Sequence, residues 1–146
     1  MEPRFEVQLK IRKPVAEVFE AVVDPGKLSG YFTQTASGRL ATGATVMWSF
    51  MEAPEPFPVT AREVVPNERI AFEWASAEGG YNTAVEMLFK ALDKGSTMVQ
   101  IRESGWRDTP LGVKSSYDNC GGWMHMACCL KAYLEHGINL RAGGAL

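Results

Sequence analysis

The first stretch of the chain alternates between apolar and polar residues. Its apolar positions lie two residues apart, at Phe5, Val7, Leu9 and Ile11. A period of two puts these side chains on one face of an extended strand. We therefore expect a strand over residues 5–11 with one buried face.

Beyond this strand the apolar spacing changes to that of a helix. Pro14 can open a helix, and Asp24-Pro25-Gly26 interrupts the pattern. A second short helical segment is predicted over residues 27–32, with the rings of Tyr31 and Phe32 pointing inward. The apolar stripe of the first helix is Val15, Val18, Phe19, Val22 and Val23.

From residue 35 the pattern returns to a period of two, which predicts a series of strands. Turn-forming residues separate these strands at 66–68, 78–80 and 93–95. Short turns between consecutive strands predict antiparallel hairpins. The residues that share inward faces are Val46, Trp48, Phe50, Ile70, Phe72, Trp74, Thr83, Val85, Met87, Phe89, Thr97, Val99, Ile101 and Glu103.

The chain ends in a long predicted helix, from near residue 116 to Gly137, where glycine can take the left-handed cap conformation. Glycine weakens a helix, so a bend or a late start is expected at Gly121-Gly122. The irregular segments 52–58 and 105–115 are predicted to border the mouth of a cavity. The inner stripe of the helix is Trp123, Ala127, Leu130 and Leu134.

These elements predict an α+β fold in which a curved antiparallel sheet wraps the terminal helix. The chain has 146 residues, enough for one domain with a sizeable core. Neither a linker nor a repeat divides the sequence. We expect a single domain over residues 1–146.

Charge and cysteine content narrow the classes of function. The chain carries 15 Lys and Arg against 17 Asp and Glu, spread along its length. This argues against binding to nucleic acid or to an anionic membrane. The first residues mix charge with single apolar residues, so neither an export signal nor a membrane span is expected. Three cysteines, Cys120, Cys128 and Cys129, fit reduced thiols in the cytoplasm.

The inward faces of the strands and the terminal helix predict a cavity for a small hydrophobic molecule. Mostly apolar walls with a few polar groups are typical of such sites. The alternative is that the same side chains fill the core. No cofactor is part of this prediction. The expected cavity residues are Phe32, Trp48, Phe50, Phe72, Trp74, Thr83, Val85, Met87, Val99, Ile101, Glu103, Trp123, Ala127 and Leu130.

Glu103 is the one candidate for acid–base chemistry, because a carboxylate on an apolar strand face is a candidate proton carrier. Catalysis would need a second group at the same mouth, which could be Tyr117, Asp118 or Asn119. The alternative is an ion pair or hydrogen bond of Glu103 near the sheet edge, with Arg62 or Arg107 as the suggested partner, and the residues at the helix start acting as caps.

One face of the terminal helix is small and weakly polar. His125 and Cys129 lie one helical turn apart and could share a metal ion, but a second pair of ligands is missing, so no metal site is predicted. Self-association to a homodimer, with Met124 taking part, is the preferred interpretation. The face carries His125, Cys128, Cys129, Ala132 and His136.

Short motifs follow one another in a distinctive order. They are Pro14 with Val18-Phe19-Glu20-Ala21 and Asp24-Pro25, Gly38-Arg39-Leu40 with Gly43, Val64-Val65-Pro66, Arg69-Ile70-Ala71-Phe72-Glu73-Trp74, Ser104-Gly105, and Gly122-Trp123 with Leu130, Tyr133, Leu134 and Glu135. In this order and spacing the chain resembles the family of the activator of heat-shock protein 90 ATPase homologue, in the START-like, birch-pollen-allergen superfamily.

The resemblance implies a helix-grip fold, with seven antiparallel strands, two short helices after the first strand, and the long helix across the concave face. It also implies a pocket for an apolar ligand. The leading hypothesis is therefore a non-enzymatic binder of a small hydrophobic molecule, acting as a carrier, sensor or assembly aid. Two alternatives stay open, an enzyme of polyketide cyclase or aromatase type that uses the same pocket, and a partner protein of a chaperone.

Overall fold

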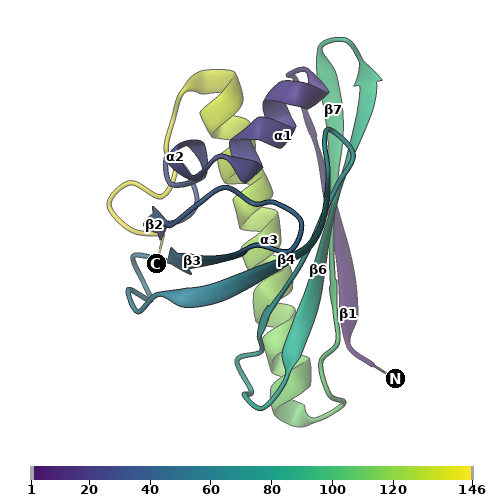
Figure 1. The fold of residues 1–146 in the computed structure, drawn as a ribbon, viewed down its shortest axis with the longest axis vertical. Helices are drawn as coiled ribbons and strands as arrows, with labels where there is room; N and C mark the ends of the chain where they lie inside the picture. The colour runs from purple at the N-terminus through teal and green to yellow at the C-terminus, as the bar shows by residue number, and fades with distance from the viewer. Residues whose placement is uncertain (1, 146) are drawn as a thin grey trace.

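The computed structural model describes residues 2–145, so Met1 and Leu146, the ends of the predicted domain, lie outside the described residues. Within residues 2–145, seven strands form one antiparallel sheet in the order β1-β7-β6-β5-β4-β3-β2. Figure 1 shows the sheet curving around one long helix. This confirms the predicted α+β helix-grip fold. The strands are β1 (Arg4–Ile11), β2 (Thr35–Ala36), β3 (Thr45–Ser49), β4 (Phe57–Val65), β5 (Arg69–Ala75), β6 (Asn82–Asp93) and β7 (Ser96–Ser104).

The predicted alternation and turns are both present in the sheet. β1 pairs antiparallel with β7, which places Phe5 opposite Glu103. The turn between β4 and β5 contains Asn67 at a φ of 63°, a left-handed conformation that asparagine adopts more readily than most residues. Gly79 and Gly80 take positive φ between β5 and β6. Local sequence therefore fixes these strand connections.

Two short helices follow β1, namely α1 (Val15–Val23) and α2 (Pro25–Leu28). α1 has the predicted bounds, but α2 begins earlier and is shorter than the segment 27–32 that the sequence predicts. The reason is a cap, because the Asp24 carboxylate accepts a backbone N–H of α2 and Pro25 occupies its first position. Tyr31 and Phe32 are 1% and 8% exposed, which confirms that both rings point inward.

The long helix α3 (Pro110–His136) begins well before the predicted start near residue 116. Thr109 is its N-cap, since the hydroxyl accepts the backbone N–H of Gly112 at 2.9 Å. Pro110 takes the first helical position, where its missing N–H costs nothing. The segment 105–115 is therefore only partly irregular, and its second half belongs to α3.

α3 runs as one helix through Gly121 and Gly122, so the predicted late start there is wrong. It ends as predicted at Gly137, which has a φ of 66°. The sheet packs along α3 over most of its length (Figure 1), and this packing supplies the stability that the glycines do not. None of the helices within residues 2–145 is both long and apolar enough to cross a bilayer.

The face of α3 that the sequence assigns to the surface is partly buried. Cys129 is 0% exposed, whereas Cys128 and His136 are exposed and His125 is half-buried. Cys129 is one turn from Met126 along α3, so it borders the stripe that packs on the sheet. Its assignment to the outer face is therefore wrong. Self-association through the remainder of this face stays a prediction.

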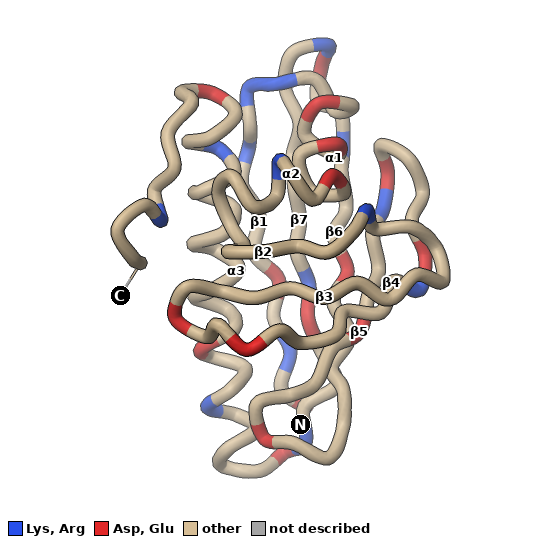
Figure 2. The backbone as a smooth tube through the Cα atoms, turned by 60° about the vertical axis from the view of Figure 1, so that its left-hand side comes forward, with Lys and Arg blue, Asp and Glu red and all other residues tan. Residues whose placement is uncertain are grey.

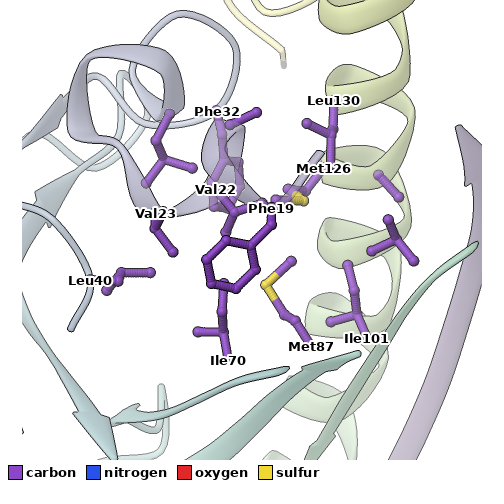
Figure 3. Packing of buried hydrophobic residues seen from close by; sticks show 14 of the residues in the cluster. Phe19, Val22, Val23, Phe32, Leu40, Ile70, Met87, Ile101, Met126 and Leu130 are labelled. Carbon is purple, nitrogen blue, oxygen red and sulfur yellow. The ribbon is translucent and has the colours of Figure 1, made fainter. Parts of the chain in front are cut away.

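The core lies between the sheet, α1 and α3. The rings of Phe19 and Phe89 meet edge to face at 5.3 Å, which joins α1 to β6. Side chains from all three layers converge, so this part of the interior is filled. Figure 3 shows them, including Phe19, Val22, Ile70, Met87, Ile101, Met126 and Leu130.

The convex face of the sheet is polar. Arg102 on β7 bonds Glu6 on β1 at 2.5 Å and Glu86 on β6 at 3.2 Å, and Arg69 on β5 also reaches Glu86. Figure 2 shows acidic and basic positions interspersed along these strands. Such exposed ion pairs contribute little stability each. The apolar side chains of the sheet lie on its opposite, concave face.

Candidate functional site

A pocket of about 230 Å³ lies between the end of β3, strand β5 and helix α3. Aromatic rings form most of its wall, and a few polar side chains stand around them. The loop after β3 contributes Glu52 and Ala53, so the start of the predicted irregular segment 52–58 borders the pocket, whereas its last two residues, Phe57 and Pro58, belong to β4. The lining residues are Phe32, Phe50, Glu52, Ala53, Trp74, Asn119, Gly122, Trp123, His125 and Arg141.

Gly122 leaves room for the pocket on the helix side. A Cβ added at this position would meet no described atom within 4 Å. The next residue, Trp123, is 2% exposed and turns its ring towards the sheet. α3 therefore presents bare backbone at one position and a large aromatic wall at the next.

The aromatic wall is a chain of ring contacts. Phe32 touches Phe50 with ring centroids 5.0 Å apart and Trp123 with centroids 5.6 Å apart. Trp123 in turn stacks on Trp74 at 5.4 Å with an interplanar angle of 28°. Aromatic pairs in this range attract each other beyond their area of contact. The wall is therefore held together by its own contacts.

Glu103 lies behind this wall and is 1% exposed. Trp74 Nε1 and Thr83 Oγ1 donate to its Oε2 at 2.9 and 2.6 Å. Trp123 Nε1 donates to its Oε1 at 2.9 Å. Asn119 Nδ2 lies 3.1 and 3.2 Å from the two carboxylate oxygens. One carboxylate thus joins β5, β6, β7 and α3 beneath the pocket.

The donors around Glu103 explain how a carboxylate can lie inside the core. Indole nitrogens can only donate, and a carboxylate can accept two hydrogen bonds or more on each oxygen. A buried polar group that is fully hydrogen-bonded avoids most of the penalty of losing water. The prediction that Glu103 is an odd polar residue on the inward face is therefore confirmed.

The partners of Glu103 differ from those that the sequence suggests. Arg62 instead pairs with Glu73 on the convex face, and the Arg107 guanidinium lies 4.5 Å above the Tyr81 ring. Both arginines lie outside the Glu103 cluster because they belong to other surfaces of the sheet and its loops. The predicted ion pair with either arginine is wrong.

Of the three residues expected to join Glu103 from α3, only Asn119 does so. Tyr117 is 73% exposed, and Asp118 pairs with Lys114 at 2.9 Å. Residues 118 and 117 lie about 100° and 200° around the helix axis from Asn119, and both side chains are mostly exposed. The expectation is wrong for Tyr117. Asp118 does not contact Glu103, but it lines an adjoining hollow that shares Glu52, Gly122, His125 and Arg141 with the pocket, so it does reach the same mouth.

The residues expected to line a cavity divide into two groups. Phe32, Phe50, Trp74 and Trp123 line the pocket. The others lie deeper, where Thr83 and Glu103 form the polar cluster. The apolar members of the deeper group belong to the buried core, and they are Trp48, Phe72, Val85, Met87, Val99, Ile101, Ala127 and Leu130.

Arg141 is a pocket residue that the sequence pattern did not indicate. It lies in the segment after α3, which returns along the molecule beside β2 and β3 (Figure 1). Its guanidinium pairs with Glu52 and lies 5.6 Å from the Phe50 ring centroid. The tail and the loop after β3 therefore meet at the rim of the pocket.

His125 and Cys129 lie together, as their helical spacing predicts, with Sγ and Nε2 3.5 Å apart. Burial raises the pKa of the Cys129 thiol, which disfavours the thiolate that a metal would need. Among residues 2–145, His, Cys, Asp and Glu form no group of three that could hold a metal ion. This pair fits packing against the core.

Comparison with solved structures places this architecture among known folds. A protein from Staphylococcus saprophyticus is 29% identical with a TM-score of 0.80, over 94% of this chain and 96% of that one. DynU16, from the dynemicin biosynthetic locus, is 24% identical with a TM-score of 0.81, over 94% of this chain and 49% of that one. This chain thus spans about half of DynU16.

The Aha1 dimer from Colwellia psychrerythraea has the same fold, with 18% identity and a TM-score of 0.73, over 92% of this chain and 97% of that one. A search of curated proteins finds no match. Residues 12–135 match the family model described as Activator of Hsp90 ATPase homolog 1-like protein. This match covers α1, α2, all of α3 except His136 and the strands that form the pocket, and the chain therefore belongs to that family.

Proposed function

We propose that the protein binds a small, mostly apolar aromatic ligand in the pocket at Gly122. The observation that carries the proposal is the bare backbone of Gly122 beside a wall of four aromatic rings. Ligand pockets in proteins are concave and apolar, with a few placed polar groups. The pocket has these properties, and its walls come from the sheet and from α3.

The size of the pocket limits the ligand. Pockets for drug-sized molecules usually measure about 300–1,000 Å³, and this one measures about 230 Å³. We therefore infer that the aromatic part of the ligand has one or two fused rings, and the adjoining hollow of about 450 Å³, which shares Glu52, Gly122, His125 and Arg141 with the pocket, has room for a substituent. Burial of its faces would contribute roughly 25 cal/mol for each Å² of apolar surface removed from water.

Glu103 supports binding better than catalysis. Its oxygens are engaged by Trp74, Thr83, Asn119 and Trp123, and the carboxylate does not line the pocket. A general acid or base must reach the proton that it moves. The cyclase or aromatase alternative predicts a loss of roughly a hundredfold or more in rate for Glu103→Gln. The binding proposal predicts that folded Glu103→Gln molecules keep their affinity for naphthalene within a few-fold of the wild type.

Naphthalene is a suitable probe for this pocket, followed through the indole N–H signals of ¹⁵N-labelled protein. The chain has four tryptophans. We expect naphthalene to shift the signals of Trp74 and Trp123. The signal of Trp106 should stay in place, because its ring packs on Phe5 outside the pocket. Bound ligand should also raise the midpoint of thermal unfolding.

Two leucine variants on α3 make a matched pair for this experiment. Gly122→Leu should fill the pocket and abolish the naphthalene shifts. Tyr117→Leu places the same side chain on an exposed position of α3 that borders neither this pocket nor the adjoining hollow at Gly121. It should bind naphthalene as the wild type does. Unshifted Trp74 and Trp123 signals in wild type, or equal binding by both variants, would refute the proposal.

A further inference from the structure

The side-chain amide of Asn119 has only one orientation that satisfies its neighbours. Its nitrogen lies 3.1 and 3.2 Å from the two oxygens of Glu103. A carboxylate accepts hydrogen bonds, so the group that faces it must be the NH₂ and not the carbonyl oxygen. The amide oxygen Oδ1 therefore points away from Glu103.

Asn119 Oδ1 makes no hydrogen bond with the described residues, although Asn119 is half-buried and lines the pocket. A hydrogen bond to a carboxylate polarises the amide and strengthens its oxygen as an acceptor. Asn119 Oδ1 is thus a fixed hydrogen-bond acceptor beside the wall of aromatic rings. The Glu103 carboxylate behind that wall sets the direction in which Oδ1 points.

Resting on the proposed ligand binding, we propose that Asn119 determines specificity by accepting a hydrogen bond from a hydroxyl or N–H group on the ligand. The ligand class is then a small planar aromatic molecule that carries a donor, such as a phenol or an aromatic amine. Glu103 is a positioning residue in this arrangement, because it holds Asn119, Trp74 and Trp123 without lining the pocket itself.

The cation at the rim argues for a neutral donor and not for an acidic ligand. Arg141 is the guanidinium that lines the pocket, and it is already paired with Glu52. An anionic ligand would have to replace that carboxylate and would meet Glu52 at the same rim. A donor group on the ligand instead finds the acceptor of Asn119 ready and displaces no protein contact.

Four probes with the same bicyclic ring test this inference by isothermal titration calorimetry. They are 2-naphthol, naphthalene, 2-methoxynaphthalene and 2-naphthoate. Because a net hydrogen bond corresponds to about tenfold in affinity, we expect 2-naphthol to bind about tenfold more tightly than naphthalene or 2-methoxynaphthalene. It should also exceed 2-naphthoate. Tightest binding by 2-naphthoate would assign the preference to Arg141 and overturn the inference.

The variants Asn119→Ala and Thr83→Val distinguish recognition of the ligand by Asn119 from the structural effect of losing a hydrogen bond to Glu103. Each removes one donor to Glu103, but only Asn119→Ala also removes the acceptor at the pocket. The preference for 2-naphthol over naphthalene should fall to about one in Asn119→Ala and should persist in Thr83→Val. A preference that persists in Asn119→Ala overturns the inference.

The probe series on the wild-type protein decides the question even if Asn119→Ala fails to fold. Equal binding of 2-naphthol, naphthalene and 2-methoxynaphthalene overturns the role of Asn119 and leaves the proposed ligand binding intact. Binding of none of the four probes overturns the proposed function, and with it this inference. The two failures are therefore distinguishable.

Discussion

Trp74 and Trp123 stack on each other and also donate hydrogen bonds to the two different oxygens of one carboxylate, that of Glu103. One ring comes from β5 and the other from α3. Stacking leaves a pair of rings free to slide, whereas the two hydrogen bonds fix the direction in which each indole points. The sheet and the helix are thereby connected at the wall of the pocket.

Replacement of Glu103 by Gln should weaken this connection. The amide keeps one acceptor oxygen but turns an NH₂ group towards donors on the other side, so at least one buried donor loses its partner. We expect the free energy of unfolding to fall by about 2–3 kcal/mol, as measured by chemical denaturation. Glu6→Gln, which removes an exposed partner of Arg102, should cost less than about 1 kcal/mol. Similar losses in the two variants would contradict the role assigned to Glu103.

Glu135 should make the stability of the protein depend on acid pH. Its side chain is 3% exposed and accepts the Arg12 backbone N–H at 2.9 Å and Lys131 Nζ at 2.6 Å. Burial acts to raise the pKa of this carboxyl, but the hydrogen bonds from Arg12 and Lys131 outweigh burial and lower the pKa from 4.5 to about 2. The folded state therefore holds the charged form more tightly than the unfolded state does.

A carboxyl with a lowered folded pKa stabilises the protein above its unfolded pKa and loses that effect as the pH falls through the folded one. The wild type should therefore lose about 2–3 kcal/mol between roughly pH 5 and pH 2 through Glu135 alone. Glu135→Gln should be less stable by a similar amount at pH 7 and should show a shallower decline in acid. Denaturant titrations at several pH values measure both, and an unchanged acid decline in the variant would refute this assignment.

Gly112 and Gly121 lie on the same helix but should respond oppositely to alanine. A Cβ at Gly112 would lie 2.1 Å from the backbone oxygen of Arg107, so Gly112→Ala must distort the N-cap and should cost about 2 kcal/mol or more. Gly121 has open space, and Gly121→Ala should add about 0.5–1 kcal/mol through helix propensity. Thermal unfolding of the two variants checks this, and shifts in the same direction would be inconsistent with it.

The sheet could be predicted because its signals are local. Alternation along each strand and the turn residues at Asn67 and Gly79 suffice to define hairpins. The start of α3 was missed for the opposite reason, because Lys114, Ser115 and Ser116 show no apolar period. The sequence does mark the start of α3 in another way, because Thr109 is a typical N-cap residue and Pro110 is typical of the first helical position. Neither signal depends on an apolar period.

The sequence indicates which residues face the candidate site, but not which of their atoms contact one another. Trp74, Glu103 and Trp123 fall on inward faces by periodicity alone. Which atoms meet depends on how the sheet curves around α3, and no sequence period encodes that curvature. Arg141 lies beyond the left-handed cap at Gly137, after which the direction of the chain is set by tertiary contacts.

The hydrogen bonds around Glu103 also affect how tightly a ligand can bind in the pocket through a small number of contacts. Each flexible side chain that a ligand must immobilise costs about 0.5–1.5 kcal/mol of binding free energy. The protein itself already holds both indoles and the Asn119 amide, so that cost is largely met during folding. A preorganised pocket of this kind should keep the same indole rotamers in its liganded form.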